Sequence, residues 1–325
     1  MSSFPTWEPT ATRATVCARA EMLATIRAFF ADHNVLEVET PTLSQAGVTD
    51  FQIESIAACV QSLSKKSLYL SSSPELPMKR LLAAGYGDIY QISRAFRDKE
   101  LGRWHQPEFS LLEWYRVGWD DVALMNEVED LLKIALQPFR PLAATLRITY
   151  REAFLEFLDI DIQSDLPMLQ QKLMKKGLDL PKNLAPDEAL DLAFSSAIAP
   201  QLDKEAITFI YDFPQDQASL ARIKPGTPPV AARFEALLGG IELANGFDEL
   251  TDAVEQRKRF ETEQKRRYKA GQHVPPIDEA FLSALSHGLP RCAGVAVGLD
   301  RLLAIATGLG DLAQTMSFAH RADGY

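Results

Sequence analysis

The fold is decided by the stretch Phe96-Arg-Asp-Lys-Glu-Leu-Gly-Arg-Trp-His-Gln-Pro-Glu-Phe-Ser-Leu-Leu-Glu-Trp-Tyr115. Its charged middle separates two segments, 88–96 and 109–117, that have the length and the aromatic and branched residues of strands. A third long segment of this kind covers 234–247. All three are predicted to be long antiparallel strands.

Helices are predicted on both sides of these strands. Apolar residues recur at helical spacing over 14–32 and 120–136, and Pro74 is typical of a helix start. The segment 35–40 is expected to be a short strand, and 294–301 passes from a strand into a helix. Strands and helices mix without a regular alternation, which predicts an α+β fold with an antiparallel sheet flanked by helices.

The 325 residues can bury a large core. We expect an N-terminal arm over 1–13 and one catalytic domain over 14–325. Between 138 and 205 the pattern weakens into short helices and Asp/Pro/Lys-rich joints, which is interpreted as an insertion within that domain.

Composition excludes several classes of protein. No run of about 18 apolar residues and no signal-peptide pattern is present, so neither a membrane span nor export is expected. Cys17, Cys59 and Cys292 are far apart, which is typical of reduced thiols in a cytoplasmic protein. The net charge of −10 argues against general nucleic-acid coating. The locally basic segment 255–269 is either a solvated helix face or a docking surface for an acidic macromolecule.

Four charged residues carry the possible chemistry. Arg97 follows a long strand, where a guanidinium can bind a phosphate or a carboxylate. Glu242 and Glu249 are seven residues apart, and a break at Asn245-Gly246 could turn both toward one Mg²⁺ ion beside substrate phosphates. Arg301 opens a helix directly after a glycine-rich strand. Each residue alone is a weak signal, but their order and spacing form a pattern.

That pattern resembles the class II aminoacyl-tRNA synthetases in all three of their signature motifs. These are the helix and strand that end at Val35-Leu-Glu-Val-Glu-Thr-Pro41, the stretch Phe96–Tyr115, and Gly298-Leu-Asp-Arg301. Ser73-Pro-Glu-Leu-Pro-Met-Lys-Arg80 and Gly240-Ile-Glu-Leu-Ala-Asn-Gly-Phe-Asp-Glu-Leu250 are similar to lysyl-specific members. Only about a dozen residues precede the first predicted helix, so the anticodon-binding β-barrel of lysyl-tRNA synthetases is expected to be absent. A lysyl-type core without that barrel resembles the elongation factor P–lysine ligases.

The resemblance implies that ATP and a lysine-type amino acid form an aminoacyl-adenylate, with Arg97 and Arg301 as catalytic residues. The implied ATP-binding residues are Arg97, Asp98, Lys99, Glu100, Gln106, Phe109, Glu242, Leu243, Gly298 and Arg301. The implied amino-acid-binding residues are Ser73, Pro74, Glu75, Tyr115, Glu249 and Ala296. Glu242 and Glu249 are expected to hold Mg²⁺, Phe109 and Arg301 to sandwich the adenine, and the first motif to form a homodimer interface.

Three positions depart from the family pattern. Lys99 stands where a glutamate normally reads the adenine amino group, and Glu100 could replace it. Gln106 stands where asparagine is usual. Ala296 replaces a glycine of lysyl-tRNA synthetases, and its extra methyl group should crowd an α-amino group, which favours β-lysine over α-lysine.

The expected function is therefore transfer of a lysine-type amino acid to a lysine side chain of elongation factor P, without a base identified for the transfer. The alternatives are a ligase that acts on tRNA or on a small molecule, and an inactive regulatory paralogue. Such a paralogue tends to lose phosphate-binding arginines or metal carboxylates, and Arg97, Glu242, Glu249 and Arg301 are all present.

Overall fold

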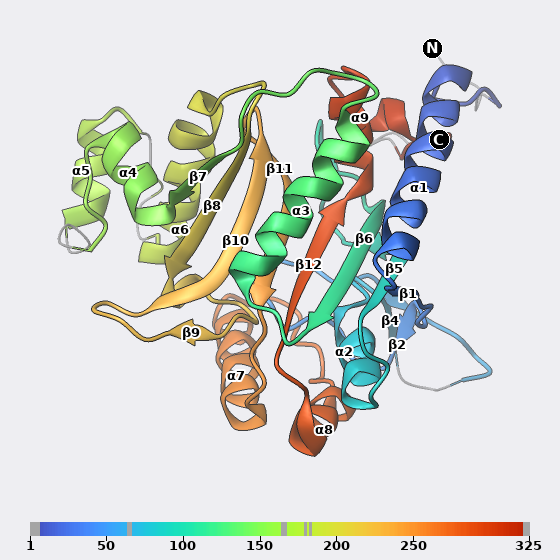
Figure 1. The fold of residues 1–325 in the computed structure, drawn as a ribbon. Coiled ribbons are helices and arrows are strands. Elements are labelled where there is room, and N and C mark those ends of the chain that lie inside the picture. Colours follow the sequence, from blue (N-terminus) through green and yellow to red (C-terminus); the bar gives the residue numbers. More distant parts are fainter. Residues whose placement is uncertain (1–6, 64–66, 164–167, 179–180, 182–183, 321–325) are drawn as a thin grey trace, which may run out of the picture.

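A computed structural model describes residues 7–63, 67–163, 168–178, 181 and 184–320. Its centre is a nine-stranded sheet (Figure 1). In spatial order its strands are β1 (Leu36–Glu37), β5 (Ile89–Phe96), β6 (Glu108–Val117), β12 (Cys292–Gly298), β11 (Ile241–Asp248), β10 (Val230–Leu238), β8 (Ile207–Pro214) and β7 (Leu146–Thr149), with β9 (Ile223–Lys224) paired to β10. β1–β5 and β7–β8 are parallel, and the other pairs are antiparallel. The predicted α+β class with an antiparallel-dominated sheet is confirmed.

One face of this sheet is covered by three helices, α1 (Arg13–Asp32), α3 (Asp121–Leu136) and α9 (Leu299–Ala306) (Figure 1). Asp120 begins α3 by accepting a hydrogen bond from the amide of Ala123, which is a standard N-cap. In the core beneath α1, the Phe30 ring stacks on Tyr90 and meets the edge of Trp114. This core covers one face of the sheet, so the opposite face is available for a site.

A second group of elements borders the opposite face. α2 (Glu75–Ala83), α7 (Ala253–Lys269) and α8 (Glu279–Gly288) gather at one end of the sheet (Figure 1). A small sheet of β2 (Leu43–Ser44), β4 (Leu68–Leu70) and β3 (Ala57–Ala58) lies nearby. α2 and α8 bury their apolar sides together around Phe281.

The region expected to be an insertion forms its own apolar cluster. α4 (Tyr150–Leu158), α5 (Leu169–Lys175) and α6 (Pro186–Ala193) pack on the outer part of the large sheet, at the β7 edge (Figure 1). Thr149 and Glu152 form a capping box that begins α4. β7 lies within this region and extends the large sheet, so the region is joined to the sheet by backbone pairing as well as by packing.

The prediction of one long strand over 234–247 is wrong. The chain forms a hairpin, β10 and β11, with Gly239 and Gly240 at its turn, where φ is 59° and 78°. A Cβ on Gly240 would lie 2.3 Å from the carbonyl oxygen of Ala199, so only glycine fits this turn. The apolar character of both strands hid the turn, because a continuous apolar pattern does not mark where a buried hairpin reverses.

None of the helices in the described ranges combines the length and the apolar character that crossing a bilayer requires.

Candidate active site

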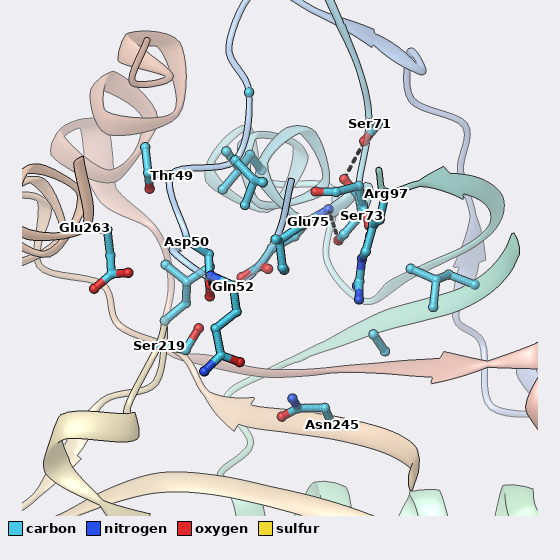
Figure 2. Close-up of a pocket in the computed structure, with 18 of the residues that line it drawn as sticks. Thr49, Asp50, Gln52, Ser71, Ser73, Glu75, Arg97, Ser219, Asn245 and Glu263 are labelled. Carbon is cyan, nitrogen blue, oxygen red and sulfur yellow. Dashed lines mark hydrogen bonds between the residues drawn. The ribbon is translucent and has the colours of Figure 1, made fainter. Parts of the chain in front are cut away.

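A cavity of about 2150 Å³ lies on the sheet face opposite α3, and Figure 2 shows part of its lining. It exceeds the roughly 300–1,000 Å³ of ordinary ligand pockets, so it has room for a nucleotide and a second substrate. The expected site residues that line it are Ser73, Glu75, Glu100, Arg97, Gln106, Phe109, Tyr115, Glu242, Leu243, Glu249, Ala296, Gly298 and Arg301. Pro74, Asp98 and Lys99 are not part of its lining.

Strand alternation explains why these residues meet. Phe109, Glu113 and Tyr115 occupy alternate positions of β6, and Gly294 and Ala296 do the same on the neighbouring β12. Successive side chains of a strand point to opposite faces, so each set faces the cavity. The register places Ala296 opposite Glu113, and Gly294 opposite Tyr115.

Arg301, at the start of α9, is held by contacts on three sides. Its Nη1 donates to the carbonyl oxygen of Glu242 at 3.1 Å and lies 3.2 Å from the Glu242 carboxylate. Its Nε donates to the Trp104 carbonyl at 3.2 Å, and its Nη2 lies 2.9 Å from Nε2 of His105. Burial and the charge of Arg301 lower the pKa of His105, which favours a neutral ring that accepts from the guanidinium. These contacts therefore fix the guanidinium at the cavity without a ligand.

Arg97 also lines the cavity. Its Nε donates to the Ser72 carbonyl at 3.4 Å, and its guanidinium lies 5.1 Å from the centre of the Phe109 ring. Glu100 lines the cavity with its carboxylate 3.7 Å from Nη1 of Arg97. Figure 2 shows Arg97 next to Ser73, whose hydroxyl accepts from the amide of Glu75 at 3.0 Å.

A buried acidic group forms the deep end of the cavity. Glu113 accepts hydrogen bonds from the Ser73 hydroxyl at 2.7 Å and from the Tyr115 hydroxyl at 2.6 Å. Lys79, on α2, places its ammonium 2.5 Å from the Glu75 carboxylate and 2.7 Å from the Glu249 carboxylate. Three carboxylates therefore converge with one ammonium and one phenol. A buried acidic group of this kind suits the ammonium groups of a lysine-type amino acid.

Burial changes the protonation of this group. It raises the pKa of Glu113 to about 7, helped by the charge of Glu75. It also raises the pKa of Glu249, where the charge of Lys79 acts in the opposite direction. Tyr115 has a pKa well above its ordinary value because of burial and the carboxylates around it. The phenol therefore stays a hydrogen-bond donor at neutral pH.

Sequence reasoning missed two members of this group, Glu113 and Lys79. Glu113 precedes Tyr115 by two residues and therefore shares its strand face, which is a usable signal. Lys79 follows Glu75 by four residues on a helix, where the two side chains are neighbours. Its second partner, Glu249, is distant in sequence and leaves no local signal.

The expected pairing of Glu242 and Glu249 around one ion does not follow from the structure. β11 pairs regularly with β12 from Ala244 to Asp248, so Asn245-Gly246 makes no break, and the irregular register against β10 leaves Leu243 without a partner instead. At about 3.3 Å of rise per residue, the two glutamates lie roughly 20 Å apart. They pair with different cations, Arg301 and Lys79.

Glu235, on β10, is a closer partner for Glu242. It lines the cavity and forms an ion pair with Arg233 at 2.6 Å. Burial raises the pKa of Glu235 to about 7, against the charge of Arg233 and with that of Glu242. The two glutamates lie on adjacent strands of the hairpin, with Leu237 opposite Glu242. The missed hairpin therefore also hid this pair from sequence reasoning.

Three expected contact residues point elsewhere. Pro74 is buried as the N-cap of α2. The amide of Asp98 donates to the Glu54 carbonyl at 2.8 Å, and Lys99 has a 73% exposed side chain that reaches toward the Glu54 carboxylate. Lys99 adopts a left-handed φ of 63° and is not part of the cavity lining. In this arrangement Glu100 is the acidic residue of the loop that faces the cavity.

The basic segment 255–269 is α7, and part of it is structural. Arg267 is buried and donates to the carbonyls of Asp50 and Ile53 and to the Glu54 carboxylate, at 2.6, 2.9 and 2.9 Å. These bonds hold the segment that carries Thr49, Asp50 and Gln52 at the cavity (Figure 2). Lys258 remains 78% exposed, so the basic segment combines structural and solvated positions.

Comparison with known proteins defines the class first. The profile of class II tRNA synthetases (D, K and N) matches residues 6–322, so the chain belongs to this family, as its motifs predicted. Among curated proteins it is 46% identical over 330 residues to the elongation factor P–(R)-β-lysine ligase of Edwardsiella ictaluri, which covers 98% of this chain and 99% of that protein. Ligases of the same name from Proteus mirabilis and Salmonella typhi are 46% and 47% identical, each with 98% of both chains covered. The resemblance to elongation factor P–lysine ligases is confirmed.

Proposed function

We propose that this protein activates (R)-β-lysine with ATP and joins it to a lysine side chain of elongation factor P. The observation that supports this most is the pocket of Glu75, Glu113, Glu249 and Tyr115, which lies in the same cavity as two guanidinium groups. Ligases of this name match the chain over nearly its whole length. The protein is thus an ATP-dependent ligase of the class II synthetase family.

In the first step the amino-acid carboxylate attacks the α-phosphate of ATP, an acyl–phosphate bond forms, and pyrophosphate leaves. Positioning and charge neutralisation dominate such a reaction. We assign Arg97 to the carboxylate and the α-phosphate, and Arg301 to the distal phosphates. Phe109 and Arg301 would bind the two faces of the adenine ring, and we assign Glu100, which lines the cavity, to its edge.

The residues present fit a magnesium ion at Glu235 and Glu242. In the ranges that the structure describes, no cluster of three or more histidine, cysteine or acidic side chains is arranged for a metal. Two carboxylates and phosphate oxygens are how proteins usually hold Mg²⁺, so the ion would arrive with ATP. Its charge would help to neutralise the phosphates. Glu249 we assign to the distal ammonium of the amino acid, because it is a buried carboxylate that lines the cavity beside Glu113 and Tyr115.

In the second step a lysine amine of elongation factor P attacks the adenylate carbonyl, an amide forms, and AMP leaves with the bonding electrons of the acyl–oxygen bond. The amine must lose a proton before or during this attack. We further propose that elongation factor P is the acceptor and that the enzyme binds no tRNA anticodon. It would act in the cytoplasm, where elongation factor P serves translation.

A homodimer through α1 and β1 is part of the proposal. The outer side of α1 exposes Val16, and β1 is a two-residue edge strand whose Leu36 is 52% exposed. An unpaired edge beside exposed apolar side chains is a usual place for a second copy to pair.

Mass spectrometry tests the proposal directly. Elongation factor P is incubated with the protein, ATP and either isomer of lysine, and a gain of one lysyl unit on a single side chain is expected with (R)-β-lysine. Acylated tRNA with unmodified elongation factor P would favour the tRNA-directed alternative. Absence of amino-acid-dependent pyrophosphate exchange would favour an inactive paralogue.

A further inference from the structure

Lys79 is a fully buried ammonium behind the amino-acid pocket. Its side chain is 1% exposed and does not line the cavity, whereas Glu75 and Glu249, which it contacts at 2.5 and 2.7 Å, both do. Lys79 therefore acts on a bound substrate through these two carboxylates and not by direct contact. Burying an ammonium group costs desolvation free energy, which only pairing with opposite charges offsets. A buried lysine at this position is therefore a candidate for a functional role.

The charged and titratable groups around Lys79 come from four elements. Glu75 lies on α2, Glu249 follows β11, Glu113 and Tyr115 lie on β6, and Cys292 lies on β12. Burial lowers the pKa of Lys79, but the charges of Glu249 and Glu75 outweigh burial and leave it above its ordinary value. Lys79 is therefore a permanent positive charge in this pocket.

We infer that Lys79 sets the charge of the pocket to match a substrate with two ammonium groups. Burial favours protonated carboxyl groups in the empty pocket, and the ammonium groups of a bound substrate favour the ionised forms. Three ionised carboxylates and one ammonium then leave two negative charges, which a lysine-type amino acid neutralises with its two amino groups. This inference rests on the proposed function. It makes Lys79 a positioning residue that determines specificity without touching the substrate.

Loss of Lys79 would leave three carboxylates for two ammonium groups, and one carboxyl group would then take up a proton. The positive charge of Lys79 lowers the pKa of both Glu113 and Glu249, so both become more readily protonated without it. A protonated Glu249 no longer attracts the distal ammonium. The enzyme would then discriminate poorly between β-lysine and an analogue without that group.

The test compares β-lysine with 3-aminohexanoic acid, which lacks the distal amine, in pyrophosphate exchange. The ratio of the two kcat/KM values is independent of how much of a preparation is active. Lys79→Met should reduce this ratio at least tenfold at pH 7, and the ratio should recover as pH rises. Lys133→Met is the matched control, because Lys133 also pairs with a glutamate four residues earlier, outside the cavity. It should keep the wild-type ratio.

The double variant Lys79→Met/Glu113→Gln tests charge against simple packing. It restores the net charge of the pocket by removing a carboxylate other than Glu75 and Glu249, the two that pair with Lys79. We expect its ratio to return close to the wild-type value, even if Lys79→Met alone fails to fold. A wild-type ratio in Lys79→Met, or no recovery of ratio or folding in the double variant, overturns the inference. Absence of exchange in the wild-type enzyme would instead contradict the proposed function.

Discussion

Arg301 donates to the backbone carbonyl of Glu242 at 3.1 Å and pairs with its carboxylate at 3.2 Å. The two residues lie 59 positions apart, on α9 and β11. The carboxylate holds the guanidinium at the cavity while leaving both groups able to meet phosphate or metal. Such fixed charges stabilise a transition state without the cost of reorganisation.

Arg301→Lys tests this arrangement. Lysine keeps a positive charge but cannot bond the Trp104 carbonyl, His105 and Glu242 at once, because it lacks the planar fork of donors. We expect β-lysine-dependent pyrophosphate exchange to fall roughly 10²–10³-fold, the usual cost of losing one stabilising donor. Arg94→Lys is the control, since Arg94 is 53% exposed and does not line the cavity. Exchange within threefold of wild type in Arg301→Lys would remove its assignment to the phosphates.

The metal assignment predicts two kinds of glutamate variant. Glu235→Gln and Glu242→Gln should raise the Mg²⁺ concentration for half-maximal exchange by about tenfold or more, because each removes one of two carboxylate ligands. Glu249→Gln should leave the Mg²⁺ dependence unchanged and raise KM for β-lysine. Titration of Mg²⁺ at saturating ATP measures both effects. A shifted Mg²⁺ dependence in Glu242→Gln and Glu249→Gln, with none in Glu235→Gln, would restore the pairing expected from the sequence.

Sequence reasoning placed the two arginines well because their surroundings are local. Arg97 follows β5 directly and Arg301 opens α9, so a strand end and a helix start put each guanidinium where it lies. The class and the antiparallel sheet followed from the same motifs. These features depend on neighbouring residues and on the period of the pattern.

The missed features depend on where a hairpin turns and on a contact between segments that are distant in sequence. Glu235 meets Glu242 only because a hairpin turns at Gly239-Gly240, and Lys79 meets Glu249 only because the end of β11 lies beside α2. The Gly239-Gly240 turn is the local signal for the first pair, whereas no local spacing encodes the second. The sequence analysis assigned Glu249 both to Mg²⁺ and to the amino acid because the sequence does not reveal its partner Lys79.

Gly294→Ala should damage the amino-acid pocket. A Cβ at this position would lie 2.3 Å from a ring carbon of Tyr115 and 2.5 Å from a carboxylate oxygen of Glu249. Overpacking of this kind costs about 1–3 kcal/mol and would displace both side chains. We expect KM for β-lysine to rise at least tenfold while KM for ATP changes little.

Gly298→Ala is the matched control on the same strand. Its Cβ would lie 3.8 Å from the nearest side-chain atom, which is an ordinary contact. Its thermal stability and KM for β-lysine should stay close to wild type. Equal effects of the two substitutions would show that β12 tolerates no side chain at either glycine, and the specific role of Gly294 would be lost.

The raised pKa of Glu113 predicts a pH-dependent stability. A carboxyl group with a pKa of about 7 in the folded protein and 4.5 unfolded stabilises the fold fully below pH 4.5. This contribution is lost as pH rises through 7. Between pH 5 and 8 the wild type should therefore lose about 2–4 kcal/mol of unfolding free energy relative to Glu113→Gln. Urea unfolding at both pH values measures the difference, and parallel pH profiles of the two proteins would contradict it.

Ala296→Gly should relax the preference between lysine isomers. Ala296 lies on the cavity face of β12, with Glu113 opposite on β6 and Asn245 opposite on β11, so its methyl group borders the amino-acid pocket. Removing it opens space for an amino group at the α position. One methyl group controls only about 10–200-fold discrimination, so the kcat/KM ratio of (R)-β-lysine to α-lysine should fall within that range. The fall should come from faster use of α-lysine. Loss of activity toward both isomers would mean that the methyl group supports the strand instead of selecting the substrate.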